Sequence, residues 1–420
     1  MVSQLFERLR SVIGALLCAA VLSACAGGSS AVTSTPQTAK TISAATGTIG
    51  HVFVIMLENK SYSETFGGNT AAPYLAQTLA SQGAMLTNYY GTGHVSLDNY
   101  ISFLSGQSPT VQTDNDCTTG YDTIAQTGTA AMSQVQGTGC IYPASVLTLA
   151  DQLAAANLTW KGYMGDMGND PARESATCGH PAVGTIDGTQ TAEAPTAAIP
   201  GGDAYATRHD PFMYFHSIID SASCKTNVVN LNAKLGSDLA SLSTTANLTF
   251  ITPNLCDDGH DSPCAIDGQT GGLSRINTFL QTWVPAILNS PAYKKDGLLI
   301  ITFDESDYST VAASSTTETI SWSGTTCCGE QEGPNLGAFP QTQSIAAGAA
   351  TISLVKSNYG GDQVGAVLLS KFIKPGTVST TPYNHYSALA SIENIFGLSH
   401  LGYAAAPGLV TFGSDVFTNL

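Results

Sequence analysis

The sequence predicts one large α/β domain with a mainly parallel central sheet, helices on both faces and long loop insertions. Short apolar runs such as HVFVIML at 51–57 and LLIITF at 298–303 have the length of strands and no polar alternation, which is typical of strands buried on both faces. Segments with helical spacing lie between these runs. No internal repeat, proline-rich stretch or charge run divides the chain after residue 48.

Strands and helices are expected to alternate along this domain. Continuous or nearly continuous apolar runs predict strands at 51–57, 85–90, 158–163, 248–252, 298–303 and 364–369. Apolar residues recurring every three or four positions predict helices at 73–81, 97–104, 146–155, 231–242, 273–288 and 387–396. The remaining long stretches have little periodicity and are expected to be loops, at 107–139, 167–204 and 309–348.

The N-terminal residues predict export. Arg8 and Arg10 precede an apolar stretch at 11–22, which is shorter than the about 20 residues that a membrane-spanning helix needs. This stretch ends in LSAC, which resembles a bacterial lipoprotein signal with Cys25 as the lipidated residue. An ordinary signal peptide with an incidental cysteine is the alternative.

These features divide the chain into a signal peptide, a tether and a folded domain. The tether is rich in Ser, Thr, Ala and Gly, so it is expected to be flexible. The expected boundaries are 1–24, 25–47 and 48–420. The protein is therefore expected in the cell envelope, held at the membrane by its lipid, or otherwise periplasmic or secreted.

The cysteines agree with export. Eight of the ten follow residue 25, and an even number in an oxidising compartment predicts disulfide bonds. Cys256 and Cys264 can close a short loop, whereas the adjacent Cys327 and Cys328 are expected to take separate partners. No CxxC pair is present, which disfavours a structural zinc site.

The net charge of −16 and the lack of any Lys/Arg cluster exclude a basic footprint, so no nucleic acid binding is expected.

Polar residues come after three of the predicted strands. Glu58-Asn59 follows the first strand, Asp304-Glu305 follows the strand at 298–303, and the run CDDGHD at 256–261 follows the strand at 248–252. The carboxyl ends of parallel strands share one edge of the sheet, so these groups are expected to meet there. Clustered carboxylates repel one another unless a cation neutralises them. Oxygen ligands suit Mg, Ca or Mn, and added imidazole admits Zn or Fe.

The segment TNYYGTGHVSLDNY at 87–100 supplies a candidate nucleophile. Ser96 is expected at the start of a helix, where backbone N–H groups and the helix dipole favour an anion. Ser is also a preferred N-cap, and this structural role is the alternative. His94 and Asn99 flank Ser96 and are candidates to contact the same anion. His209 and His385, in RHDP and YNHYS, are further candidates for an acid, a base or a ligand.

Together these segments resemble the bacterial and fungal phosphoesterase family that includes acid phosphatases and phospholipases C, similar to a branch of the alkaline phosphatase superfamily. The matching segments span nearly the whole domain: 51–67, 87–106, 159–167, 208–215, 251–261, 301–305 and 365–404. The resemblance implies a metal held by Glu58, Asn59, Asp304 and Glu305, with Ser96 as the nucleophile. It further implies that His260, Asp261 and His385 bind phosphate or a second metal, and that His209 contacts phosphate.

The resemblance implies hydrolysis of phosphate esters, of the acid phosphatase type, with His260 or His385 as the acid for the leaving group. A phospholipase C acting on lipid phosphodiesters shares this chemistry and is the first alternative. A non-catalytic surface lipoprotein that binds a ligand is the alternative of another class. No arginine is placed as an obvious phosphate clamp, so the metal and the helix N-terminus are expected to supply most of the positive charge.

Overall fold

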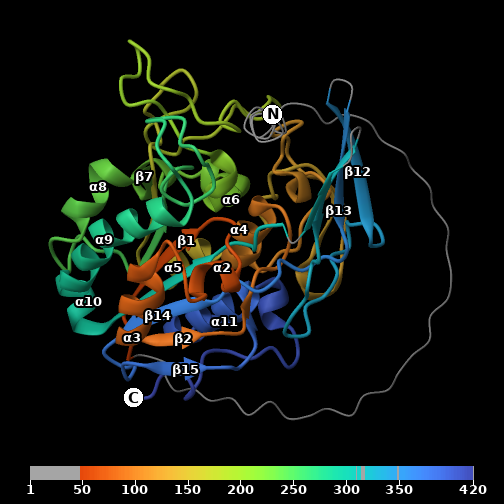
Figure 1. The fold of residues 1–420 in the computed structure, drawn as a ribbon. Helices are drawn as coiled ribbons and strands as arrows, with labels where there is room; N and C mark the ends of the chain where they lie inside the picture. The colour runs from red at the N-terminus through yellow and green to blue at the C-terminus, as the bar shows by residue number, and fades with distance from the viewer. Residues whose placement is uncertain (1–47, 309, 314–316, 348–349, 420) are drawn as a thin grey trace, which may run out of the picture.

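The computed structural model describes residues 48–308, 310–313, 317–347 and 350–419 (Figure 1). The expected signal peptide at 1–24, the tether at 25–47 and Cys25 lie outside the described residues. Among the described residues, no helix is both long and apolar enough to span a membrane.

An eight-stranded sheet forms the centre of the domain, in the order β15-β2-β14-β9-β1-β8-β6-β7. The strands from β9 to β7 are parallel, and β14 runs antiparallel to both of its neighbours, β9 and β2. The mainly parallel sheet expected from the sequence is therefore confirmed. The bounds are β1 (His51–Leu57), β2 (Ala84–Leu86), β6 (Trp160–Met164), β7 (Val228–Asn230), β8 (Leu248–Thr252), β9 (Gly297–Phe303), β14 (Ala366–Ser370) and β15 (Thr377–Ser379).

Each predicted helix is present, with its ends shifted by a few residues. The segment predicted at 73–81 is a π-helical turn, η1 (Tyr74–Leu79), followed by α3 (Ala80–Gln82). The other predicted helices are α4 (Ser96–Ser105), α5 (Leu149–Ala155), α8 (Leu231–Asp238), α9 (Leu273–Asn289) and α11 (His385–Phe396). Shorter helices include α2 (Tyr62–Phe66), α6 (His216–Ile219), α7 (Cys224–Asn227), α10 (Pro291–Asp296) and the 3-10 turns η4 (Thr207–His209) and η5 (Pro211–Tyr214).

The helices cover both faces of the sheet, which explains the continuous apolar strands. Val54 of β1 pairs with Phe250 of β8, so these side chains share one face and Phe53 lies on the other. Phe250 contacts Phe103 of α4, with ring centroids 5.8 Å apart, whereas Phe53 contacts Tyr293 of α10 at 6.3 Å. All seven residues of β1 are buried as a result.

The expectation of loops was wrong for two of the three long insertions. The insertion at 309–348 contributes to a second sheet of β10 (Thr310–Ala313), β11 (Thr317–Trp322), β12 (Gln341–Ala347) and β13 (Ala350–Lys356), seen beside the main body in Figure 1. The insertion at 107–139 contains a hairpin of β4 (Ala125–Thr129) and β5 (Val135–Thr138). These strands are rich in Ser, Thr, Gly and Ala, so they lack the continuous apolar signal of the central sheet.

Three disulfide bonds join Cys117–Cys140, Cys178–Cys224 and Cys327–Cys328. The expectation that Cys327 and Cys328 take separate partners was wrong, because these neighbours bond to each other in a turn where Cys328 has φ of 65°. The expected link between Cys256 and Cys264 is not formed. Both thiols are buried and free, although they lie close enough for the Cys264 thiol to contribute to the raised pKa of Cys256, after burial.

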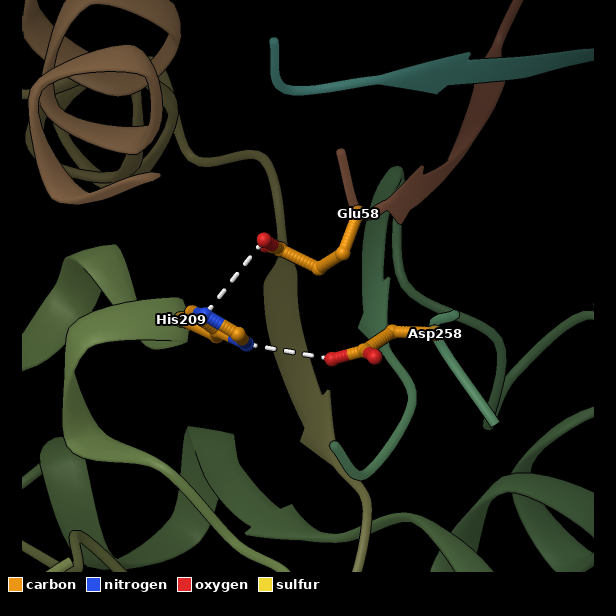
Figure 2. A group of neighbouring side chains, drawn as sticks. All are labelled: Glu58, His209 and Asp258. Carbon is orange, nitrogen blue, oxygen red and sulfur yellow. Dashed lines mark hydrogen bonds and ion pairs between the residues drawn. The ribbon is translucent and has the colours of Figure 1, made fainter. Parts of the chain in front are cut away.

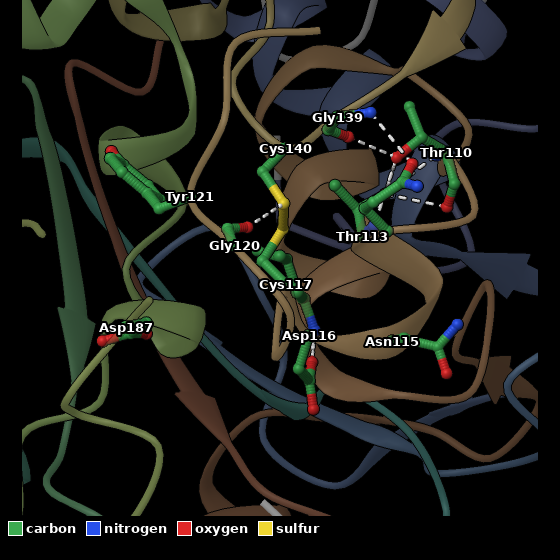
Figure 3. The surroundings of a disulfide bond; sticks show 12 residues. Thr110, Thr113, Asn115, Asp116, Cys117, Gly120, Tyr121, Gly139, Cys140 and Asp187 are labelled. Carbon is green, nitrogen blue, oxygen red and sulfur yellow. Dashed lines mark hydrogen bonds between the residues drawn. A yellow bond between two sulfur atoms is a disulfide. The ribbon is translucent and has the colours of Figure 1, made fainter. Parts of the chain in front are cut away.

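The Cys117–Cys140 bond fixes a turn that supports α4 (Figure 3). Asp116, next to Cys117, accepts the backbone N–H of Leu97 in the first turn of α4, at 3.0 Å from its Oδ1. On the other side of the bond, Thr110 donates its hydroxyl to the Gly139 carbonyl at 2.6 Å. The disulfide therefore holds in place the carboxylate that accepts a backbone N–H from the first turn of this helix.

Removal of this cross-link should lower the free energy of unfolding. For the loop of 23 residues, the chain-entropy account gives a loss of about 3 kcal/mol in the double variant Cys117→Ser/Cys140→Ser. Denaturant unfolding followed by circular dichroism measures it, with Cys264→Ser as the control for replacement of a cysteine that is not cross-linked. An unchanged denaturation midpoint in the double variant would contradict this account.

Candidate active site

Three neighbouring strands end in carboxylates at one edge of the sheet. β1 lies between β9 and β8, so Glu58, Asp304 and Asp258 follow adjacent parallel strands or the short loop after one. Backbone hydrogen bonds hold them together: the Glu58 N–H donates to the Asp258 carbonyl and the Asp304 N–H donates to the Leu57 carbonyl, both at 2.9 Å. The convergence expected from the sequence is what the fold produces.

Glu58 is fully buried at the centre of this group. Its Oε1 accepts the Tyr100 hydroxyl at 2.5 Å and its Oε2 accepts the Ser96 hydroxyl at 2.9 Å. Burial, with Asp304 and Asp258 close by, raises the pKa of Glu58 well above its ordinary value. An ionised Glu58 therefore requires positive charge beside it.

Asn59 and Asp304 complete an oxygen-rich corner. The Asp304 Oδ1 accepts the Asn59 backbone N–H at 3.0 Å, and burial raises the pKa of Asp304 to about 6. The end of the Asn59 amide lies 2.7 Å from Glu58 Oε2 and 3.2 Å from Asp304 Oδ1. With its nitrogen towards them, the amide donates to both carboxylates. With its oxygen towards them, three oxygens face one another beside the Ser96 hydroxyl, an arrangement that fits a divalent cation of the oxygen-preferring type.

His209 contacts both Glu58 and Asp258 (Figure 2). The Nδ1 of His209 is 3.1 Å from Asp258 Oδ2, and its Nε2 is 3.5 Å from Glu58 Oε2. Burial, reinforced by Arg208 and His260, lowers the pKa of His209 well below its ordinary value, so the imidazole is neutral. A carboxylate on Nδ1 favours a proton there and leaves the Nε2 lone pair towards Glu58. Glu58, His209 and Asp258 together can hold a metal ion.

Ser96 is the first residue of α4, and its hydroxyl is not a helix cap. The N-cap is Val95, and the Ser96 hydroxyl donates to Glu58 instead. The alternative of a purely structural N-cap is therefore not what the structure shows. Asn99 lies one turn further on, with its amide bonded to the Thr92 N–H and the Gly93 and Val95 carbonyls, so it shapes the turn that precedes Ser96.

His94 connects Glu305 with Asp362. Its Nδ1 bonds to the Glu305 carboxylate and its Nε2 lies 3.0 Å from Asp362 Oδ2. Burial opposes the charged imidazole, but Glu305 and Asp362 outweigh it and raise the pKa of His94 to about 9. Glu305 therefore neutralises a histidine here, which separates it from the group of Glu58, Asn59 and Asp304.

His385 contacts the backbone of Asp304. Its Nε2 donates to the Asp304 carbonyl at 2.6 Å, and its Nδ1 accepts the Tyr89 hydroxyl at 3.0 Å. The side chain is fully buried, and burial lowers the pKa of His385 to about 4. Both ring nitrogens are engaged, an arrangement that orients the end of β9 and favours a positioning role over the predicted exchange of protons with a substrate.

A cavity of about 670 Å³ opens over Ser96. His260 and Asp261 line it, with His260 Nδ1 2.8 Å from Asp261 Oδ1. Arg208 is buried next to His260. Its guanidinium lies 3.3 Å from His260 Nε2 and 3.8 Å from the carboxylate of Asp116. No arginine was expected as an obvious phosphate clamp, and the η4 turn beside His209 brings Arg208 next to His260.

Arg208, Tyr100 and Asp362 belong to this site but were not among the predicted site residues, and Asp258 was predicted only as part of the run 256–261. Asp258 and Arg208 had a usable signal, since each lies within two residues of a predicted site histidine. Tyr100 and Asp362 had none, because a tyrosine on a helix and an aspartate in a loop have many structural roles.

Comparison with known proteins agrees with the resemblance. A family model described as the Phosphoesterase family matches residues 69–399. An acid phosphatase of Aspergillus fumigatus is 23% identical over 350 residues, which cover 83% of this chain and 55% of that protein. A phosphatidylinositol-3-phosphatase of Mycobacterium tuberculosis is 22% identical over 369 residues, covering 88% and 84%. The chain spans about half the length of the fungal relatives it matches.

Among solved structures, a protein in the alkaline phosphatase superfamily from Vibrio parahaemolyticus has a TM-score of 0.46 and 11% identity, covering 88% of this chain and 70% of that one.

A divalent cation should stabilise the protein through the Glu58, Asn59 and Asp304 group. At a free concentration of 100 times its Kd, one bound ion adds about 2.7 kcal/mol to the free energy of unfolding. Thermal unfolding with and without Mg²⁺, Ca²⁺, Mn²⁺, Zn²⁺ or Fe²⁺ measures the effect. Asp304→Asn should lose it, and the control Asp238→Asn, whose carboxylate pairs with Lys161 elsewhere, should keep it. An equal shift in both variants would contradict this site.

Proposed function

Because the chain belongs to the phosphoesterase family, we propose that it is an exported, metal-dependent hydrolase of phosphate esters, of the acid phosphatase type. The observation that carries this proposal is the Ser96 hydroxyl, which donates to the buried carboxylate of Glu58 at 2.9 Å below a cavity of about 670 Å³. Covalent phosphoryl transfer needs a nucleophile that is hydrogen-bonded to a potential base and lies beside groups that fit a cation.

In the proposed first step, Glu58 receives the proton of Ser96, and Oγ attacks the phosphorus atom. The bond between phosphorus and the ester oxygen breaks, and this oxygen takes a proton from His260, which acts as the general acid. His260 is preferred over His385 as the acid because its side chain is 30% exposed and borders the cavity, whereas His385 is enclosed.

In the second step, His260 takes a proton from a water molecule whose oxygen attacks the phosphorus atom of the phosphoserine. The bond between phosphorus and Oγ breaks, Ser96 regains its proton from Glu58, and phosphate leaves. Arg208 lies behind His260 and supplies a permanent positive charge to the anionic group. The backbone dipole at the first turn of α4 also favours the anionic group.

The residues that would hold a metal ion are Glu58, Asn59 and Asp304, together with His209 and Asp258, which form a second possible ligand group with Glu58. A bound divalent cation would supply positive charge that lowers the pKa of a nearby hydroxyl and balances charge on a phosphate oxygen. The donor set admits Mg, Ca, Mn, Zn or Fe.

Export and membrane anchoring complete the proposal. The three disulfide bonds support an oxidising compartment, and Cys25 with the tether at 25–47 would attach the catalytic domain, 48–420, to the membrane. The cavity volume of about 670 Å³, the size of a small-molecule site, favours a small ester over the second candidate, a phospholipase C acting on lipid phosphodiesters.

Replacement of the nucleophile is the direct test. Ser96→Ala should reduce kcat on p-nitrophenyl phosphate by at least about 10³-fold, because no phosphoserine can form. Its thermal unfolding should stay close to that of the wild type. Ser105→Ala, which removes a buried hydroxyl at the other end of α4, is the matched control and should retain turnover. Substantial turnover by Ser96→Ala would contradict the assignment.

Arg208 should contribute to binding of the transferring group. Arg208→Met should lower kcat/KM by about 100-fold, the usual cost of removing one charged donor from such a site. Arg208→Lys should recover part of this loss, since it restores the charge without the planar geometry. Steady-state kinetics and the inhibition constant of inorganic phosphate measure both effects. Equal inhibition by phosphate in the wild type and in Arg208→Met would show that Arg208 does not contact the anion.

A further inference from the structure

One wall of the cavity comes from the second sheet and has an apolar face. Glu318, Ile320 and Trp322 alternate along β11, so their side chains project to the same face, and all three line the cavity. Leu354 of β13 lies directly opposite Ile320 in the parallel register and lines it too. We call Ile320, Trp322 and Leu354 the apolar wall.

The apolar wall is fixed to the catalytic edge at two points. The Trp322 ring lies 5.8 Å from the ring of His94, which bonds to Glu305. Asp362, the other partner of His94, accepts the backbone N–H groups of Gly324 and Thr325, just after β11, at 3.1 and 2.7 Å.

The second point is Lys356 at the end of β13. Its Nζ lies 3.0 Å from Asp114 Oδ1 and donates to the Asp114 carbonyl, also at 3.0 Å. The wall is therefore held at a set position in the cavity that Ser96 also lines, as a recognition surface requires.

The chemistry of the cavity selects against charge on the group opposite the phosphate. The apolar wall offers apolar carbon surface and one indole N–H, and the rest of the lining includes the carboxylates of Glu64 and Glu318 as well as Lys60. An anionic leaving group would be repelled by these carboxylates, and a charged or polar group placed against the apolar wall would lose hydration, with the indole N–H as the one donor of that wall. An aromatic or compact apolar group would bury its surface against the wall, and about 670 Å³ is the size of a small-molecule site.

We propose that the apolar wall of Ile320, Trp322 and Leu354 binds the leaving group of the substrate and selects phosphate esters whose leaving group is aromatic and uncharged. This inference rests on the proposed function, because it assigns the leaving-group side of the same site. The three residues determine specificity, whereas Ser96 and Glu58 carry out the reaction.

The experiment compares two monoesters with the same phosphate group, phenyl phosphate and glycerol 3-phosphate. The metal-loaded wild type and Leu354→Ser, Ile320→Ser and Trp322→Ala are assayed on both. Each wall variant should lower the ratio of kcat/KM for phenyl phosphate to that for glycerol phosphate by about tenfold or more. Val378→Ser replaces an apolar strand residue that is 62% exposed and outside the cavity, and it should leave the ratio unchanged.

Binding provides a readout that does not depend on turnover. The affinity of phenylphosphonate, measured by calorimetry, should fall about tenfold in Leu354→Ser, while that of methylphosphonate stays the same. A proportional loss for both esters and both phosphonates, in variants that unfold at the wild-type temperature, would overturn the inference. A wild-type preference for a long-chain alkyl phosphate over phenyl phosphate would also overturn it. Absence of turnover on every ester by the wild type would instead refute the proposed function.

Discussion

The burial of Glu58, Asp258 and Asp304 side by side is the constraint on which the rest of the site depends. The three carboxylates meet because they follow adjacent parallel strands, and burial raises the pKa of each. Their ionised forms are tolerated only where donors and positive charge surround them. The hydroxyls of Ser96 and Tyr100 and the neutral imidazole of His209 meet part of this need, and a cation would meet the rest.

This electrostatic demand explains why the neighbouring elements are so firmly held. α4 must present Ser96 to Glu58, and its first turn is anchored by Asp116 beside the Cys117–Cys140 bond. His385 holds the end of β9 through its hydrogen bond to the Asp304 carbonyl. A displacement of either element would separate a buried carboxylate from its donor, and an unpaired buried charge is far more costly than a lost surface contact.

The central sheet and the meeting of Glu58 with Asp304 were predictable from the sequence, because apolar runs of seven and six residues leading directly into acidic residues allow few folds. The second sheet was not. In TETISW at 317–322, only Ile320 and Trp322 are apolar, and so short a pattern resembles a polar loop. The pairing of Glu305 with His94 was also beyond the sequence, since the motif groups Glu305 with Asp304 and only three-dimensional packing separates the two. Cys327 and Cys328 show the same limit, because adjacency alone gives no pairing.

The second sheet also bears on how such a protein can diversify. The groups beside Ser96 sit on strands enclosed on both faces, where almost any replacement disturbs packing. β11 lies outside the central sheet, and most of its side chains are partly exposed. Replacements there carry a small penalty in stability, so mutation can explore this stretch while the catalytic edge stays constant. Lineages descending from one such ancestor would be expected to differ most between residues 317 and 356.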